Sequence, residues 1–533
     1  MFFNSVEFFI FLAVVFLVYF LVPKKVQWII LLLSSYFFYA YFSWKFLFFI
    51  ITTTVTTFLC ARFFWKENKK QQEFLENNKD IDSEQKKKYK QKIKKNKKTL
   101  FVLTLLFNFG ILVFLKYANF FIGNINSIIG WFGPKGNIAS LHLLLPLGIS
   151  FYTFQAMGYL IDCYWGKVEP QKNIFRFALF ISYFPQIIEG PISRYNDLEP
   201  QLEEKHSFDY KEFTYGMQLV LWGLFKKMVI ADALGIFVDK IFGDVAGANG
   251  LQAFVAVIFY AIQDYADFSG CMDIVLGISQ CMGIKLMQNF KRPYFSRSIA
   301  EYWRRWHITL GSWFKDYLFY PFSISKGSIK LGKWSKKHFG NEFGKQVPAM
   351  LGLALCWLTT GLWHGASWNY ILWGVYYGIL IMLSIILEKP FAKCKEKLKI
   401  NESSFWWKAF QMVRTFSLLL VGRIIFRASS LADAWLLFKK TFTVLAFNSP
   451  VASLFSYSFS IPVMIVALLA TVVLLVVDIV KERRPEDFSI RDTISKKKLA
   501  LRWLVWILLF VAVIVFGIYG SAEGSSQFIY VQF

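Results

Sequence analysis

Two of the five histidines lie beside tryptophans in strings whose residue types suit acid–base chemistry. His364 follows the apolar run 351–363 and lies in the string GLWHG at 361–365. An ionisable side chain at membrane depth predicts a functional site, and burial favours the neutral imidazole that a general base needs. The position equally suits a core histidine bonded to a backbone carbonyl. Because Gly361 and Gly365 carry no side chain, we expect a narrow substrate to approach His364 closely.

The second string, YWRRWHITL at 302–310, contains His307. Continuous helical spacing places His307 on one face with the two tryptophans and the final leucine of the string. We therefore expect the histidine to point into packed protein with these apolar side chains. Arg304 and Arg305 fall off that face. They suit pairing with acids, binding a phosphorylated donor, or reaching their charged ends toward the membrane interface.

The remaining polar residues carry weaker signals. His206 and His338 fall in charged stretches and suit solvated surfaces, whereas His142 opens an apolar run and suits the membrane interface. Asp264 and Asp267 are acids within an apolar stretch, with either a structural role or a role in a site.

The sequence contains no motif for metal, nucleotide or hydrolase chemistry beside the two histidine strings. The six cysteines are scattered without metal-ligand spacing, so we expect neither zinc nor a disulfide framework. The sequence contains no G-x-x-x-x-G-K-[ST], H-E-x-x-H or G-x-S-x-G string. We expect no bound cofactor.

The composition predicts a membrane protein as the scaffold for these residues. The 533-residue chain is 56% hydrophobic and 20% aromatic but only 18% charged, whereas soluble proteins are about 45–50% apolar and about 25% charged. This balance excludes disordered, collagen-like, disulfide-rich and secreted soluble classes. Part of the net charge of +25 lies in 66–98, with 13 lysines against 6 acids. This segment is typical of a solvated cytoplasmic loop, not of a nucleic-acid partner.

Apolar runs predict an all-α, polytopic integral membrane protein that forms a single domain over 1–533. We expect about 11 to 13 true spans, because 270–321 and 431–447 suit re-entrant or surface helices instead. The first run is a retained helix, since it lacks the basic start and cleavage site of a signal peptide. The candidate spans are 6–22, 26–42, 45–65, 99–118, 140–160, 174–190, 213–236, 251–267, 347–364, 367–387, 405–426, 460–480 and 499–519.

Basic segments predict the orientation of these spans. Lysines at 24–25 and the basic segment 66–98 are two crossings apart, and both should face the cytoplasm. The basic stretch 481–498 precedes the final span and should face the same side. We therefore expect both termini, including the tail 520–533, outside the bacterial cytoplasmic membrane.

Together the strings resemble the membrane-bound O-acyltransferase (MBOAT) superfamily. More narrowly they are similar to its bacterial branch of alginate O-acetylases and peptidoglycan O-acetyltransferases. The two histidine strings and WFKDY at 313–317 are the specific part of a resemblance that covers nearly the whole chain. Further matching segments are SSYFFY at 34–39, YFPQ at 183–186, EGPI at 189–192, GLFKK at 223–227, DYADFSG at 264–270 and FIYVQF at 528–533.

The resemblance implies the MBOAT fold, a ring of helices around a central tunnel that joins the two membrane faces. It also implies that His364 is the catalytic histidine and His307 the second active-site residue. A hydroxyl would attack a thioester donor, acetyl-CoA, with His364 as base and His307 as positioning or oxyanion group, or with these roles exchanged. Further tunnel or substrate-contacting residues expected on this basis are Arg304, Arg305, Trp306, Trp363, Asp267 and Glu189.

The same resemblance implies a role at the cell surface. Acetyl groups from cytoplasmic acetyl-CoA would cross the membrane toward a hydroxyl of an extracytoplasmic polysaccharide, and a separate SGNH/GDSL-type acetyltransferase partner would complete the transfer. Tyr530 in the tail suits either an acyl relay or an aromatic membrane anchor. Val531 stands where the family usually has Phe.

Two alternative functions stay open. One is D-alanyl transfer from a carrier protein toward teichoic acid. The other is a polysaccharide transporter or flippase, which would not need paired intramembrane histidines.

Overall fold

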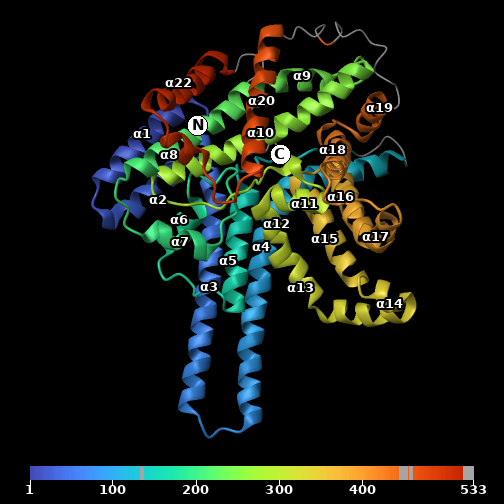
Figure 1. Cartoon of the computed structure of the whole chain (residues 1–533). Coiled ribbons are helices and arrows are strands. Elements are labelled where there is room, and N and C mark those ends of the chain that lie inside the picture. Colours follow the sequence, from blue (N-terminus) through green and yellow to red (C-terminus); the bar gives the residue numbers. More distant parts are fainter. Residues whose placement is uncertain (132–136, 443–453, 455–459, 520–533) are drawn as a thin grey trace. The chain divides into compact units, whose positions relative to one another are not determined.

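The part of the chain that the structure describes is helical, as its apolar runs predict. The computed structural model describes residues 1–131, 137–442, 454 and 460–519 (Figure 1). Within these ranges the only β pairing is an isolated antiparallel bridge between Phe290 and Trp306. Tyr530 and the rest of the tail 520–533 lie outside the described residues.

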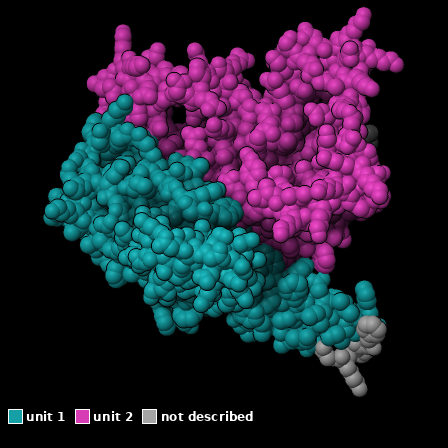
Figure 2. Space-filling view, turned by 90° about the horizontal axis from the view of Figure 1, so that it is seen from below, with its two compact units in different colours: residues 1–214, 278–287 teal, residues 215–277, 288–533 magenta. Residues whose placement is uncertain are grey.

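The chain divides into two compact units, which Figure 2 shows in different colours. One contains residues 1–214 and 278–287, the other residues 215–277 and 288–533. That both belong to a single domain over 1–533 stays a prediction.

The first unit contains the N-terminal helices. Their bounds are α1 Val6–Leu21, η1 Lys24–Val26, α2 Gln27–Phe42, α3 Phe46–Asn77, α4 Ser83–Trp131, α5 Ile149–Trp165, α6 Ile174–Ser182, α7 Tyr195–Glu203 and the start of α8 Tyr210–Leu224.

The second unit contains the remaining helices. Their bounds are η2 Phe225–Ala231, α9 Asp232–Gly243, α10 Gly250–Cys281 (whose last turn lies in the first unit), η3 Pro293–Phe295, α11 Ile299–Arg305, α12 Ile308–Phe314, η4 Lys315–Phe319, α13 Tyr320–Ser323, α14 Lys326–Gly344, α15 Val347–His364, α16 Trp368–Ile386, α17 Glu388–Lys397, α18 Phe405–Arg427, α19 Leu431–Phe442, α20 Ile461–Glu482, α21 Ile490–Ser495 and α22 Leu499–Phe516.

The protein is a multi-pass membrane protein. Seven of the described helices are long and apolar enough to cross a membrane, fewer than the 11 to 13 spans expected. They are α3, α4, α15, α16, α18, α20 and α22, and α1 is a shorter apolar helix. In the stretch 270–321, α10 continues to Cys281 and short helices follow between 293 and 323. The re-entrant or interfacial character expected of this stretch stays a prediction.

Two expected spans are shorter than predicted. The helix expected at 174–190 ends at Ser182, and the buried segment 183–194 is not helical. Pro185 and Pro191 account for this, because proline cannot donate the backbone hydrogen bond of a continuing helix. Likewise the span expected at 140–160 begins only at Ile149, after Pro146.

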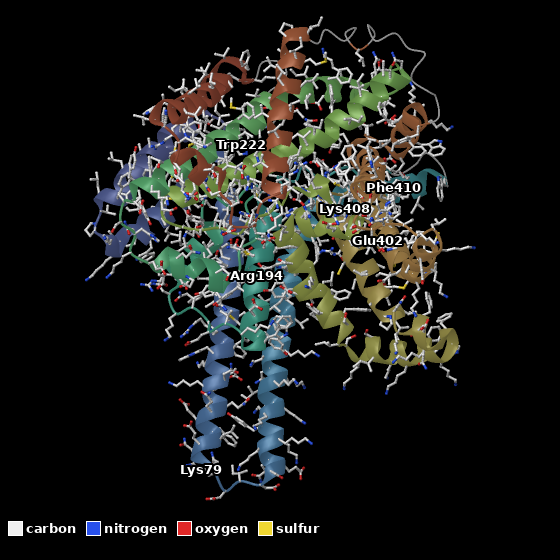
Figure 3. The ribbon with its side chains drawn as sticks, viewed as in Figure 1. Lys79, Arg194, Trp222, Glu402, Lys408 and Phe410 are labelled. Atoms are coloured by element: carbon white, nitrogen blue, oxygen red, sulfur yellow. The ribbon has the colours of Figure 1, made fainter. Side chains whose placement is uncertain are left out.

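The basic segment 66–98 is not a loop but a helical hairpin. α3 and α4 continue through it as two long helices joined by 78–82, with Lys79 at the far end (Figures 1 and 3). The rings of Phe74 and Tyr89 stack between them at 3.8 Å. Lysine, glutamate and glutamine are strong helix formers, which explains why a charge-based interpretation alone missed these helices.

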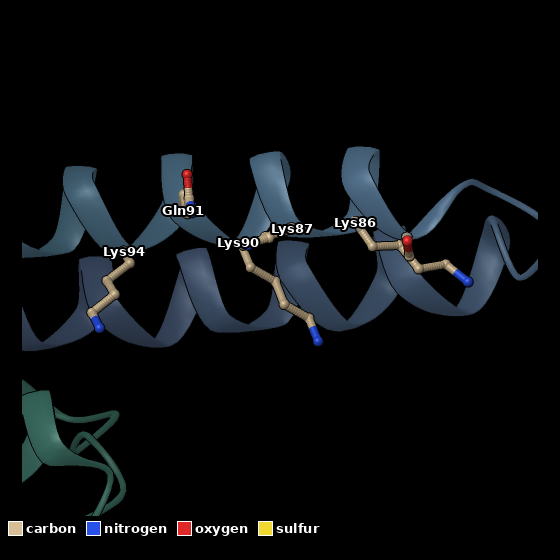
Figure 4. Close-up of a pocket in the computed structure, with 6 residues that line it drawn as sticks. Lys86, Lys87, Lys90, Gln91 and Lys94 are labelled. Atoms are coloured by element: carbon tan, nitrogen blue, oxygen red, sulfur yellow. The ribbon is translucent and has the colours of Figure 1, made fainter.

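One face of the hairpin, on α4, is rich in lysine. An open hollow of about 440 Å³ is lined there by Ser83, Lys86, Lys87, Lys90, Gln91 and Lys94. In Figure 4 the side chains of Lys90 and Lys94 extend to the same side. Nearly all of these side chains are exposed, so the expectation that the segment is solvated is confirmed.

In the second unit, buried ion pairs join α10 to the π-helical segment η2. Lys227 Nζ lies 2.6 Å from Asp267 Oδ1 and 2.9 Å from Asp232 Oδ1. The adjacent Lys226 Nζ lies 2.7 Å from Asp273 Oδ2. Charged residues at membrane depth are tolerated when they pair inside the protein, and these pairs fix the position of α10.

Candidate active site

His307 lies at a break between two short helices. α11 ends at Arg305, Trp306 is extended, and His307 adopts a left-handed backbone with φ 48° and ψ 50° before α12 begins at Ile308. The continuous helical face predicted for this string is therefore wrong. Histidine is one of the few non-glycine residue types enriched at positive φ, so the sequence can make this break without a glycine.

The environment expected for His307 is nevertheless correct. Its side chain is only 3% exposed. The imidazole centroid lies 5.0 Å from that of Phe268 and 5.6 Å from that of Trp363, both edge-on. Burial lowers the pKa of His307 to about 3, so near neutral pH the ring is uncharged and keeps one N–H donor.

Asn289 supports the break on its C-terminal side. The backbone N–H of Ile308 donates to the carbonyl oxygen of Asn289 at 3.1 Å. The N–H and the hydroxyl of Thr309 donate to Asn289 Oδ1 at 3.0 and 2.7 Å. The first N–H groups of a helix have no partner within it, so Asn289 supplies a cap to α12 from a different part of the chain.

Arg423 supports the break on its N-terminal side. Its guanidinium carbon lies 4.5 Å from the centroid of the Trp306 ring, and Nη2 donates to the hydroxyl of Tyr302 at 2.8 Å. The same guanidinium forms an ion pair with Asp264. Both charged side chains are buried, so Asp264 balances the charge that contacts Trp306.

His364 is the last residue of α15 and lies among aromatic rings. Its ring centroid lies 4.8 Å from that of Trp373, 4.9 Å from Trp363 and 5.1 Å from Phe426. The side chain is 4% exposed. The indole of Trp363 therefore contacts both histidines, and the structure brings His307, His364 and Trp363 together.

The expectation that Gly361 and Gly365 admit a substrate is wrong. A Cβ on Gly361 would lie 2.4 Å from the carbonyl oxygen of Tyr370, and one on Gly365 would lie 2.4 Å from Cε2 of the Tyr370 ring. The space beside both glycines is filled by α16. These glycines allow two helices to approach closely and thereby position His364.

The structure gives the two arginines of the string at 302–310 different surroundings. Arg305 forms ion pairs with Glu301 at 2.7 Å and with Glu482 at 2.9 Å. Arg304 is exposed. Of the three roles considered for these residues, pairing with acids is the one that the structure describes for Arg305.

Three further residues were expected in the site, namely Asp267, Glu189 and Tyr530. Asp267 is buried in its ion pair with Lys227. Glu189 is buried in the first unit, in the segment 183–194. Tyr530 lies outside the described residues.

The three other histidines take ordinary positions. His142 and His338 are exposed, and Nδ1 of His338 lies 2.9 Å from the carbonyl oxygen of Trp334. His206 is half-buried, and its Nε2 lies 2.8 Å from the carbonyl oxygen of Gln201. The expectation of a solvated side chain is therefore correct for His338 and only partly so for His206.

Sequence reasoning missed Asn289, Arg423 and the aromatic neighbours of His364 on other helices. Arg423 did offer a signal, because an arginine within the apolar stretch 405–426 is an ionisable residue at membrane depth. Asn289 offers none, since a single asparagine in a polar stretch has many ordinary roles.

Comparison with known proteins defines the class to which this site belongs. Residues 171–395 match the membrane-bound O-acyltransferase family, MBOAT, and contain both histidine strings. The chain is thus similar to that family over this region, as the motifs predicted.

Individual relatives match about three fifths of the chain. Over 343 residues the chain is 36% identical to "Probable alginate O-acetylase AlgI" of Pseudomonas aeruginosa, covering 64% of this chain and 60% of the relative. It is 32% identical over 364 residues to "Peptidoglycan O-acetyltransferase" of Helicobacter pylori, covering 63% of each. It is 28% identical over 295 residues to "Teichoic acid D-alanyltransferase" of Bacillus subtilis, covering 55% and 71%. The first two matches thus span less than two thirds of the relatives.

Proposed function

We propose that the protein is a membrane O-acyltransferase that acetylates a cell-surface polysaccharide. The observation that carries the proposal is the pair of buried histidines, His307 and His364, that share Trp363 within the region matched to the family. The names of the P. aeruginosa and H. pylori relatives support acetyl as the transferred group and an envelope polymer as the acceptor.

In the proposed reaction a ring nitrogen of His364 takes the proton of the attacking hydroxyl. The hydroxyl oxygen forms a bond to the carbonyl carbon of the thioester. The carbon–sulfur bond then breaks, and its electron pair leaves with the sulfur, which receives the proton. A general base at this position accelerates the reaction by about 10²–10⁴-fold. The donor we propose is acetyl-CoA, which is already activated, so no enzyme nucleophile is needed.

His307 has a different part in this scheme. Its uncharged ring keeps one N–H, which would donate to the oxygen that gains negative charge as the hydroxyl adds. The low pKa of His307, about 3, makes it a poor base near neutral pH, which favours His364 as the base.

The arrangement across the membrane is part of the proposal. Acetyl-CoA would bind on the cytoplasmic side, and the acetyl group would pass through a central tunnel to the extracytoplasmic side. A separate SGNH/GDSL-type partner would complete the transfer, with Tyr530 as the candidate relay in the tail. The basic segments support this orientation, which places both termini outside the cytoplasmic membrane.

The test measures ester-linked acids released from surface polymers by mild alkali. We compare the parent strain with a deletion strain that carries the wild-type gene, His364→Ala or His338→Ala. His338 is an exposed histidine, so His338→Ala is the matched control. We expect the deletion and His364→Ala to lose acetate, and the wild type and His338→Ala to restore it.

Other outcomes would overturn separate parts of the proposal. Loss of D-alanine instead of acetate would replace the donor and leave the chemistry intact, as the B. subtilis relative allows. Full acetate with His364→Ala would remove His364 as the base and favour transport of a polysaccharide intermediate. Full acetate with Tyr530→Phe would remove the relay.

A further inference from the structure

The backbone at His307 needs support from outside its own segment. A left-handed conformation at a non-glycine residue is sparsely populated and persists only when its surroundings hold it. Residues 306 and 307 join α11 to α12. α11 has only seven residues, a length that is too short to be stable alone. The conformation of His307 must therefore be fixed by contacts with other elements.

Asn289 and Arg423 make such contacts on the two sides of the histidine. Asn289 receives three hydrogen bonds from Ile308 and Thr309, which follow His307 directly. Arg423 lies on the face of Trp306, which precedes it. Asn289 and Trp306 are each almost fully buried, so water does not compete for these contacts.

Asn289 is well suited to this position. Its carbonyl and side-chain oxygens together accept the first two backbone N–H groups of α12 and one hydroxyl. A further bond connects Nδ2 to the sulfur of Met272 in α10, at 3.3 Å. Asn289 thus ties the start of α12, and with it the backbone of His307, to the helix that also contains Phe268, a neighbour of the His307 ring.

We propose that Asn289 and Arg423 are positioning residues that hold His307 in its left-handed conformation and so aim its ring in the reaction. The inference rests on the proposed function, in which His307 takes part in acyl transfer. Neither residue contacts the reacting atoms in this proposal. Both act through the backbone and the ring next to His307.

The test uses the full-length protein purified in detergent, with acetyl-CoA as donor, deacetylated alginate as the hydroxyl-bearing acceptor, and release of the free thiol of the donor as the readout. Asn289→Ala removes the side-chain acceptor, whereas Asn289→Asp keeps an oxygen in the same place. Arg423→Lys keeps a positive charge near Asp264 but loses the flat contact with Trp306 and the forked bond to Tyr302. Thr309→Val removes only one of the hydrogen bonds that Asn289 accepts.

We expect kcat to fall by about 10- to 100-fold in Asn289→Ala, because misplacement of a reacting group by about 1 Å has effects of this size. KM should change little. Asn289→Asp should restore most of the kcat that Asn289→Ala loses. In Arg423→Lys kcat should fall by about tenfold, and in Thr309→Val it should fall least. Rates are referred to folded protein, measured as the monodisperse fraction in size-exclusion chromatography.

Asn108 provides the matched control. It is a buried asparagine whose side chain bonds Thr56 and the carbonyl of Thr104 in the first unit. We expect Asn108→Ala to lower stability without lowering kcat of the folded fraction. Equal kcat loss in Asn108→Ala and Asn289→Ala would show a general structural effect and overturn the inference.

The remaining outcomes separate this inference from the proposed function. A deletion strain that keeps its surface acetate, or His364→Ala with full activity, would overturn the proposed function. An active wild type and an inactive His364→Ala, together with wild-type kcat in Asn289→Ala and Arg423→Lys, would overturn only the positioning role.

Discussion

The basic hairpin at 66–98 and the histidine site hold their polar groups in opposite ways. In the hairpin the lysines of α4 are mostly exposed. The two helices meet there through the stack of Phe74 on Tyr89 and through a hydrogen bond from Lys97 Nζ to Asn68 Oδ1 at 2.8 Å. In the site both histidines are almost fully buried among rings from several helices. The effect of a substitution in the hairpin should therefore follow from residue type. In the site the effect should depend on contacts with residues that are distant in the sequence. Substitutions in the two regions can test this difference.

The largest effect is expected from removal of the base. His364→Ala leaves the aromatic neighbours in place but removes the proton acceptor, so acetyl transfer should fall by at least about 10²-fold. The thiol-release assay on purified protein measures this loss. A residual rate within tenfold of wild type would show that burial among aromatic rings, not acid–base chemistry, accounts for His364.

A comparable loss of rate is expected at His307, and it should depend on the backbone conformation that the new residue can adopt. Val is β-branched and disfavours positive φ, whereas Asn adopts it readily and keeps an N–H donor. We expect His307→Val to lose about 10²–10³-fold, the usual effect of removing an oxyanion donor, and His307→Asn to lose clearly less.

The pH profile separates the two histidine roles. Burial lowers the pKa of His307 to about 3, so this ring gains a proton only below the assay range and stays neutral above it. The acid limb of kcat/KM between pH 5 and 8 should therefore keep its midpoint in His307→Asn. A limb that shifts or vanishes in this variant would identify His307 as the titrating base and exchange the two roles.

Helix packing beside His364 should be sensitive to a single methyl group. Gly361→Ala places a Cβ 2.4 Å from the backbone oxygen of Tyr370, and overpacking of this kind costs about 1–3 kcal/mol. Thermal unfolding in detergent should show a lower Tm.

The control is Gly110→Ala in α4, where nothing lies within 4 Å of the added Cβ. This control should leave Tm equal or raise it, because alanine favours the helix. Equal Tm in both variants would contradict the close packing of α15 on α16.

The smallest effect is expected in the hairpin. Joint replacement of Lys87, Lys90 and Lys94 by Gln removes three exposed charges and should change the free energy of unfolding by less than about 0.5 kcal/mol per site. Activity in the thiol-release assay should stay within twofold of wild type. A clear rise in KM for acetyl-CoA would break the comparison, because the hairpin would then belong to the donor site.

The contrast between local residue type and long-range contacts explains which features of the fold and the site could be predicted from the sequence. Helical class, membrane character and the two histidines follow from hydropathy and from side-chain chemistry, which are local properties. The break at His307 does not, because it depends on Asn289 and Arg423, which approach only in the folded chain. The roles of Gly361 and Gly365 were misjudged for the same reason, since Tyr370 fills the space that the sequence leaves open. Charge alone predicts a loop at 66–98, whereas the helix propensity of its lysines, glutamates and glutamines predicts the helices that the structure contains.

The length of α4 has a consequence for the electric field around the hairpin. From Ser83 to Lys98 the helix is basic and lies ahead of the apolar stretch that begins at Thr99. At 1.5 Å per residue this part is about 24 Å long, roughly three screening lengths at physiological ionic strength. Lysines near Thr99 can interact electrostatically with charged lipid headgroups, whereas for lysines near the turn at 78–82 this interaction is screened by salt. Along this single helix, therefore, only the lysines nearest Thr99 lie within one screening length of the start of the apolar stretch.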